Sequence, residues 1–201
     1  MTKSELLSHA PPLYRLAHAL KDIRHRREHE PTRQKNELLR ETARSHGLRV
    51  LIETGTHTGE TAWFFRHAFD RIETIELEPG LARLARIRFA RTPSVHVHEG
   101  DSADALPRIL QTLDRPALFW LDAHPCTDRS AREAAVPLVA ELAAIAAHPV
   151  DGDVVLVDDM RLMGADGFPG VDLLAIPGYR LEQVGDIGVL APGDGSGSLQ
   201  A

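Results

Sequence analysis

Short apolar runs alternate along the chain with segments in which apolar residues recur at helical spacing. Seven runs resemble β-strands, because β-branched and aromatic residues are frequent in them and polar or turn-forming residues bound them. These runs are residues 49–54, 71–77, 95–101, 117–122, 153–159, 179–186 and 187–193. Helices are predicted over residues 60–69, from Pro79 to residue 89, around Pro107 and from near Pro137.

This alternation predicts an α/β fold. Strands joined by helices of this length imply crossover connections and a parallel sheet covered on both faces. The last two runs flank a Gly-Asp turn, which predicts an antiparallel hairpin that closes the sheet. We therefore expect seven strands in a mostly parallel sheet, with a C-terminal antiparallel hairpin and helices on both faces.

The two ends of the chain have a different pattern. Residues 1–46 are predicted to be helical, with a break at Pro31, and to form a lid on the main domain of residues 47–192. One helical face there carries Leu13, Leu16, Leu20 and Ile23. Residues 193–201 are rich in glycine and serine and are predicted to be a disordered tail.

Composition narrows the class of protein. A chain of 201 residues suits one domain with a substantial core, and a net charge of −6 argues against a general nucleic-acid binder. The basic run at residues 24–30 contains interleaved glutamates, which favours a solvated helix face over an anion-binding patch. The single cysteine, Cys126, excludes an internal disulfide framework and fits a reducing compartment.

Hydropathy predicts neither a membrane span nor a signal peptide, so we expect a cytoplasmic protein. We expect a small-molecule substrate and no nucleic-acid or membrane partner. The oligomeric state stays open, with a homodimer as one alternative.

The candidate chemistry lies where strands end, since open parallel sheets bind ligands at the carboxyl ends of their strands. The first run ends in Glu53 and is followed by Gly55, Thr56, His57 and Gly59. Glycines at this point let the backbone turn sharply and approach a ligand. The spacing G-x-x-x-G differs from the G-x-G-x-x-G of dinucleotide sites, and this motif alone leaves a glycine-marked turn without a ligand as an alternative.

Acidic residues end the next two runs. Glu76 stands 21 residues beyond Gly55, close to the spacing of about 20 at which an acidic side chain reaches ribose hydroxyls. Glu78, just before Pro79, is better placed to cap the following helix. Asp101 is compatible both with a bond to an adenine amino group and with a helix cap.

A second acidic group follows the fourth and fifth runs, which end in Asp122 and in the pair Asp158 and Asp159, with His124 nearby. Three neighbouring carboxylates repel one another unless they are protonated or balanced by a cation, and such oxygen ligands suit Mg²⁺, Ca²⁺ or Mn²⁺. The alternative is that one aspartate caps a helix and another pairs with an arginine such as Arg161.

Residues 49–162 resemble the class I S-adenosylmethionine-dependent methyltransferases, through "IETGTHTGETAWF", "IETIELEP", "VHVHEGDSADALPRIL", "ALFWLDAH" and "DVVLVDDMRLMG". Within that class the chain is most similar to small bacterial proteins related to the macrocin O-methyltransferase family. The resemblance implies a Rossmann-like fold in which Gly55 and Gly59 flank the methionine part of the cofactor. It also implies that Glu76 binds the ribose and that Asp101 and Ser102 lie by the adenine.

The resemblance to metal-dependent members further implies that Asp122, Asp158 and Asp159 bind Mg²⁺ and place the acceptor hydroxyl. The segment after Asp122, "AHPCTDRSAREAAVP", matches no motif of that family. The predicted cofactor-binding residues are Glu53, Gly55, Thr56, His57, Gly59, Glu76, Asp101, Ser102 and Asp122.

The resulting prediction is transfer of a methyl group to a hydroxyl of a sugar or another small molecule. Catalysis is assigned to Asp122 and to His124 as the base, ahead of His57, whose loop faces the cofactor. Two alternatives stay open: an oxygenase-like reaction with iron at Asp122 and His124, and a non-catalytic regulatory protein that binds the adenosyl group. The aromatic residues Trp63, Phe64 and Phe65 are expected to pack their helix on the sheet, and Trp120 to lie in the core.

Overall fold

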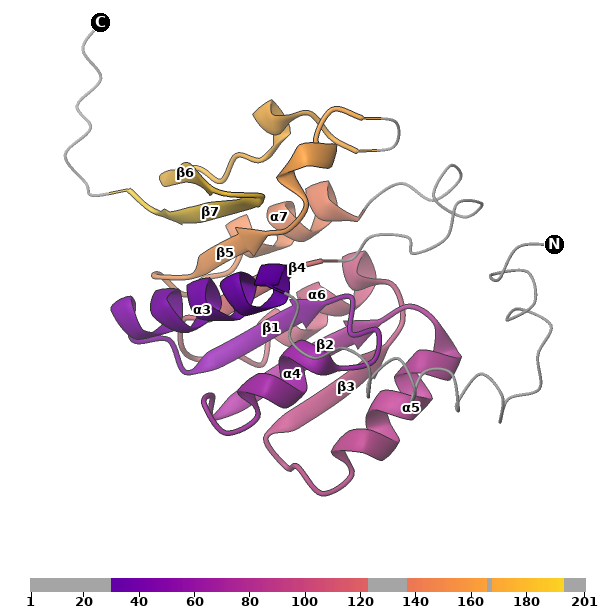
Figure 1. Cartoon of the computed structure of the whole chain (residues 1–201). Helices are drawn as coiled ribbons and strands as arrows, with labels where there is room; N and C mark the ends of the chain where they lie inside the picture. Colours follow the sequence, from indigo (N-terminus) through magenta and orange to yellow (C-terminus); the bar gives the residue numbers. More distant parts are fainter. Residues whose placement is uncertain (1–29, 123–136, 166–167, 194–201) are drawn as a thin grey trace, which may run out of the picture. The chain divides into compact units, whose positions relative to one another are not determined.

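The computed structural model describes residues 30–122, 137–165 and 168–193 (Figure 1). The chain divides into two compact units, Met1–Leu38 and Leu39–Ala201, with the boundary inside helix α3 (Glu30–Ser45). In the first unit only residues 30–38 are described, and they form the N-terminal part of α3. Pro31 stands in the first turn of α3, where a missing backbone N–H breaks no helical hydrogen bond. The helix predicted around Leu13 to Ile23 and the tail from residue 194 lie outside the described residues.

The second unit contains one seven-stranded sheet, as predicted. Its strands are β1 (Val50–Thr54), β2 (Arg71–Glu76), β3 (Val95–Glu99), β4 (Leu118–Leu121), β5 (Val154–Val157), β6 (Tyr179–Val184) and β7 (Ile187–Pro192). The strand order is β3-β2-β1-β4-β5-β7-β6. Strands β1 to β5 pair in parallel, whereas β7 is antiparallel to both β5 and β6. The predicted parallel sheet and terminal hairpin are therefore confirmed.

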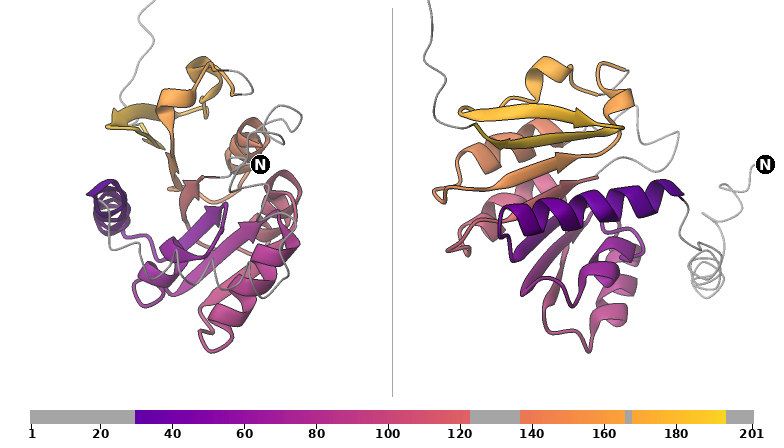
Figure 2. Two further views of the ribbon diagram at one scale, coloured as in Figure 1. Left: turned by 45° about the vertical axis from the view of Figure 1, so that its right-hand side comes forward. Right: turned by 60° about the vertical axis from the view of Figure 1, so that its left-hand side comes forward.

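Helices cover both faces of this sheet. The helices are α4 (Glu60–Phe65), α5 (Pro79–Phe89), α6 (Ser102–Leu110) and α7 (Leu138–Ala146), with short 3₁₀ turns at Met160–Leu162 and Val171–Leu173. In Figures 1 and 2, α4 and α5 lie on one face, and α6 and α7 lie together on the other. The helices change face because the strand order reverses between β1 and β4, and such a switch point opens a crevice at the carboxyl ends of the strands.

The first crossover helix is shorter than predicted, because α4 ends at Phe65 instead of residue 69. The chain then turns, with the Ala68 N–H donating to the Phe65 carbonyl, so that Phe69 packs edge-on against Phe65 before β2 begins. The prediction that the aromatic residues of this helix pack it on the sheet is correct for Phe65. It is wrong for Trp63, which is 39% exposed. So short a helix buries only one narrow face.

The sheet centre forms the core. Strands β1, β4 and β5 are buried at every position, which explains their near-continuous apolar sequences. Trp120 in β4 lies in this core, as predicted. Among the described residues, no helix is both long and apolar enough to cross a bilayer.

Candidate functional site

A tight loop connects β1 to α4, and three of its residues have left-handed backbone. Gly55, His57 and Gly59 have φ angles of 87°, 48° and 73°. The N–H groups of Gly55 and Thr56 both donate to the carbonyl of Ile75 in β2, at 3.0 Å each. Glycine adopts this backbone readily, whereas His57 adopts it only where surrounding contacts hold it. The two glycines singled out in the sequence therefore shape a bend at the carboxyl end of β1.

Glu76, the last residue of β2, anchors this loop from the strand side. Its side chain is 7% exposed. Its Oε2 accepts a hydrogen bond from the His57 N–H at 2.6 Å, and its Oε1 accepts one from the Glu78 N–H at 2.9 Å. A carboxylate offers about four acceptor positions, so each oxygen can accept a further bond. Glu76 is thus oriented by the backbone and retains the acceptors that a vicinal diol requires.

Glu53 is a buried carboxyl group next to the loop, 2% exposed. Thr74 lies opposite it in β2, and the Thr74 hydroxyl donates to Glu53 Oε2 at 2.7 Å. A further hydrogen bond of 2.6 Å joins the hydroxyls of Thr74 and Thr56. Burial raises the pKa of Glu53 to about 8, although the bonds from Thr74 and Thr61 oppose the rise. The carboxyl group is therefore mostly protonated at neutral pH.

Two other acidic residues cap helices. Asp101 Oδ1 accepts from the Ala103 N–H at 2.9 Å and caps α6, and Glu78 Oε2 accepts from the Leu81 N–H at 2.8 Å and caps α5. The cap predicted for Glu78 is confirmed. For Asp101 the cap is present and uses Oδ1. The contact of Asp101 with the adenine stays a prediction, for which the other carboxylate oxygen is the candidate acceptor. Ser102 is buried as the first residue of α6.

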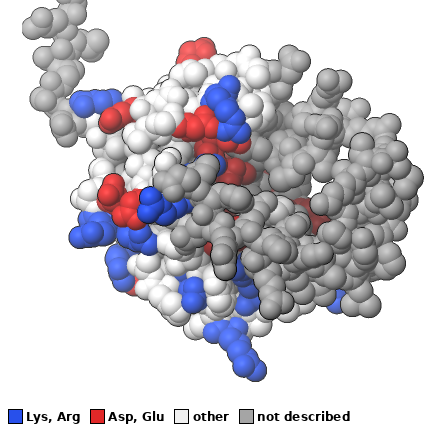
Figure 3. Space-filling view, in the orientation of Figure 1, with Lys and Arg blue, Asp and Glu red and all other residues white. Residues whose placement is uncertain are grey.

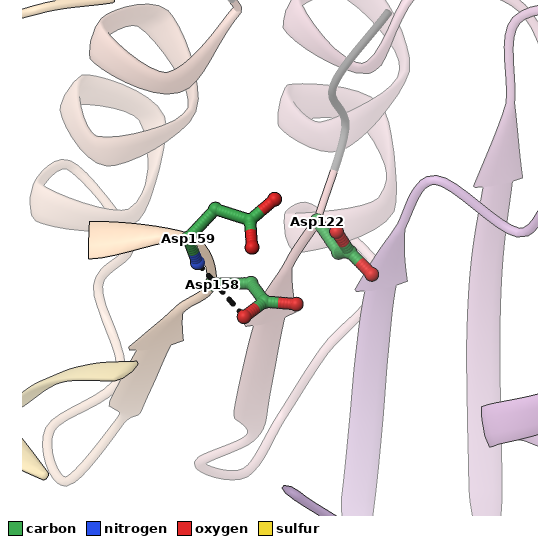
Figure 4. A group of neighbouring side chains, drawn as sticks. All are labelled: Asp122, Asp158 and Asp159. Carbon is green, nitrogen blue, oxygen red and sulfur yellow. Dashed lines mark hydrogen bonds between the residues drawn. The ribbon is translucent and has the colours of Figure 1, made fainter. Parts of the chain in front are cut away.

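Three aspartates meet at the neighbouring ends of β4 and β5 (Figure 4). Carboxylate oxygens of Asp122, Asp158 and Asp159 all lie within 4.8 Å of one another. The strand pairing brings them together, because the Asp122 N–H donates to Thr54 at 3.1 Å and the Asp158 N–H donates to Leu121 at 3.0 Å. The predicted cluster of carboxylates is present, and its oxygens have the chemistry that a hard divalent cation prefers.

The alternative interpretation, in which one of these aspartates pairs with an arginine, is also observed in part. Arg161 Nη1 lies 2.5 Å from Asp159 Oδ1 and also bonds to Asp186. Asp158 Oδ1 accepts the Asp159 N–H at 2.8 Å. Because Arg161 is largely exposed, its pairing with Asp159 is screened by water. Arg161 thus balances part of the negative charge, and a cation at the cluster would compete with it for Asp159.

His124, the predicted base, and Cys126 lie outside the described residues. On the face drawn in Figure 3, acidic side chains of the described residues lie mostly in the upper half, mixed with basic ones, and the lower half shows mainly basic side chains.

Sequence reasoning missed two residues at the loop. Thr74 binds Glu53, and Arg88 donates to the carbonyl of Thr58. A weak signal existed for Thr74, which is two residues before Glu76 in the same strand and so shares its face. The sequence held no such signal for Arg88, because its contact with Thr58 depends on how α5 packs against the loop.

The same fold occurs in solved methyltransferase structures. An O-methyltransferase from Bacillus cereus, in complex with SAH (S-adenosylhomocysteine), superposes with a TM-score of 0.61 and 19% identity over 90% of this chain and 89% of that one. The SAH-bound methyltransferase PaMTH1 of Podospora anserina gives 0.59 and 16% identity over 89% and 88%. The O-methyltransferase TomG of Streptomyces achromogenes, in complex with SAM (S-adenosylmethionine), gives 0.57 and 21% identity over 92% and 90%.

At these identities the similarity shows the fold alone, which is Rossmann-like. No protein-family model and no curated protein matches the sequence, so membership of the macrocin O-methyltransferase family stays a prediction.

Proposed function

We propose that the protein is an S-adenosylmethionine-dependent methyltransferase that methylates a hydroxyl group of a sugar or another small molecule. The observation that carries this proposal is the joint geometry of Glu76 and the left-handed loop from Gly55 to Gly59. Chains of the same fold were crystallised with SAM or SAH, which supports S-adenosylmethionine as the cofactor.

The cofactor fits the described residues. The free acceptor positions of Glu76 suit the ribose hydroxyls, and the glycine bend leaves backbone close to the methionine part. Glu53 and its threonine hydroxyls lie beside that bend and supply polar hydrogen-bonding groups. When bound, S-adenosylmethionine supplies an electrophilic methyl group on a positively charged sulfonium.

Methyl transfer is an in-line displacement, so the protein must mainly hold donor and acceptor in line and activate the acceptor. A hydroxyl attacks poorly at neutral pH and therefore needs either a base or a nearby positive charge. Asp122, Asp158 and Asp159 are the residues that would hold a divalent cation for this purpose, and their three carboxylates fit one. A cation held there would lower the pKa of an adjacent hydroxyl. His124 is our candidate for the base that takes the proton.

The test of the cofactor assignment is calorimetric titration with S-adenosylmethionine and S-adenosylhomocysteine. We expect both to bind wild-type protein, and Glu76→Ala to weaken binding by about ten- to a hundredfold, since hydrogen bonds to a charged group are lost. Glu99→Ala is the matched control, because Glu99 is the register partner of Glu76 in β3 and pairs with Arg86 at the surface.

No binding of either compound at millimolar concentration would refute the methyltransferase proposal. Binding that Glu76→Ala leaves unchanged would refute only the ribose assignment. Transfer of a labelled methyl group to hydroxyl-bearing small molecules distinguishes an enzyme from a protein that binds the cofactor without catalysis.

A further inference from the structure

The last turn of α5 contacts the outer side of the loop between β1 and α4. Arg88 Nη1 donates a hydrogen bond to the carbonyl of Thr58, 2.5 Å away. The next residue, Phe89, packs against Gly59 so closely that a Cβ added there would lie 2.8 Å from Phe89 Cε2. Gly59 is therefore required both for its positive φ and for the space that Phe89 occupies.

Trp63 holds the Arg88 side chain in place. The Arg88 guanidinium carbon lies 5.0 Å from the centre of the Trp63 ring, and that of Arg66 lies 3.9 Å from it. The Trp63 and Phe89 rings are 6.2 Å apart. Burial lowers the pKa of Arg88, although a guanidinium stays charged in proteins. The partly exposed Trp63 thus orients a charged donor instead of filling the core.

Two opposing hydrogen bonds hold adjacent residues of the loop. On the strand side, Glu76 accepts the His57 N–H, and on the α5 side Arg88 donates to the Thr58 carbonyl. Thr58 stands between His57 and Gly59, both in left-handed backbone. Such backbone persists in a non-glycine residue only where neighbouring contacts hold it.

We propose that Arg88 is a positioning residue for the cofactor: it holds His57–Gly59 in place and, through the His57 N–H, fixes the orientation of Glu76. The inference rests on the proposed function, because it assigns Arg88 control over adenosyl-cofactor affinity.

The experiment compares Arg88→Met with Arg86→Met, a matched control on the same helix that removes the surface pair with Glu99. We expect Arg88→Met to weaken S-adenosylhomocysteine binding about tenfold, the loss of one hydrogen bond from a charged donor. Amide hydrogen exchange at His57 and Gly59 should become faster in the unliganded protein, whereas Arg86→Met leaves both quantities unchanged.

A double-mutant cycle separates positioning from general destabilisation. If Arg88 acts through Glu76, Arg88→Met weakens binding less than about twofold in a Glu76→Gln background. An undiminished tenfold loss there would contradict action through Glu76. Arg88→Lys keeps the charge but loses the planar guanidinium, so its affinity for S-adenosylhomocysteine should lie between those of wild-type protein and Arg88→Met. Arg88→Lys replaces Arg88→Met in these measurements if Arg88→Met does not fold.

Unchanged affinity together with unchanged exchange in the Arg88 variants overturns the inference. If the wild-type protein binds no cofactor, the proposed function fails. The exchange rates of His57 and Gly59 still decide whether Arg88 holds the loop.

Discussion

At the scale of single residues, Glu53 has the most unusual environment among the candidate site residues. It is enclosed at the end of β1, and threonine hydroxyls are its hydrogen-bond donors. Sequence reasoning placed Glu53 at the site but could not foresee its protonation. That property depends on the register between β1 and β2, which sets Thr74 opposite Glu53.

Glu53 should make the stability of the protein depend on pH. Its pKa is about 8 in the folded protein and starts from 4.5, so between these values the unfolded chain ionises while the folded chain stays protonated. Stability therefore falls as pH rises through this window, by at most about 5 kcal/mol. In Glu53→Gln this decline should be absent, as measured by urea unfolding at pH 5 and pH 8.

Glu99→Gln is the control for that measurement, because Glu99 is an exposed carboxylate at the end of β3, two strands away from β1 in the same sheet. A Glu53→Gln variant with the same pH dependence as wild-type protein would show that Glu53 ionises freely in the folded state.

At the scale of elements, the two helices that follow β2 and β3 begin in the same way. Glu78 caps α5 and Asp101 caps α6, each with a carboxylate that accepts a backbone N–H. The cap of α5 was predictable, because an acidic residue directly before Pro79 is a local signal. The length of α4 was not, because its end depends on where Phe65 and Phe69 pack.

Matched cap variants test whether Asp101 does more than cap. Asp101→Ala and Glu78→Ala should each lower the free energy of unfolding by about 1 kcal/mol, the usual loss for a capping side chain. Only Asp101→Ala should also weaken S-adenosylhomocysteine binding, because we assign the other Asp101 oxygen to the adenine. Urea unfolding and calorimetry measure the two effects, and equal cofactor affinity in both variants would leave Asp101 a cap alone.

At the scale of the whole molecule, the topology decides which strand ends are neighbours. The order reversal between β1 and β4 places the glycine loop on one side of the switch point and Asp122 on the other. Asp158 and Asp159 join Asp122 because β5 pairs with β4. The cluster is therefore assembled from segments far apart in the sequence.

A cation bound to this cluster should stabilise the folded state, because the unfolded chain does not bring the carboxylates together. At a free Mg²⁺ concentration of one hundred times Kd the gain is about 2.7 kcal/mol, which thermal unfolding detects as a higher Tm. Asp158→Asn should abolish this shift and any Mg²⁺-dependent methyl transfer. Asp114→Asn, which alters an exposed aspartate paired with Arg115, is the control.

Methyl transfer that continues unchanged in excess chelator would rule out a role for the metal in catalysis. A Tm shift of equal size in Asp158→Asn would place the cation elsewhere on the protein.

The sequence by itself determined the succession of strands and helices along the chain, the terminal hairpin and the bend at Gly55 and Gly59. It also determined that Glu76 is the acidic residue at the end of the next strand. These features depend on periodicity and on spacing within one β-α-β unit, which are local properties of the chain. Only the tertiary structure decided that Arg88 bonds to Thr58 and that Thr74 bonds to Glu53. These contacts depend on strand register and helix packing, which are set by the fold as a whole.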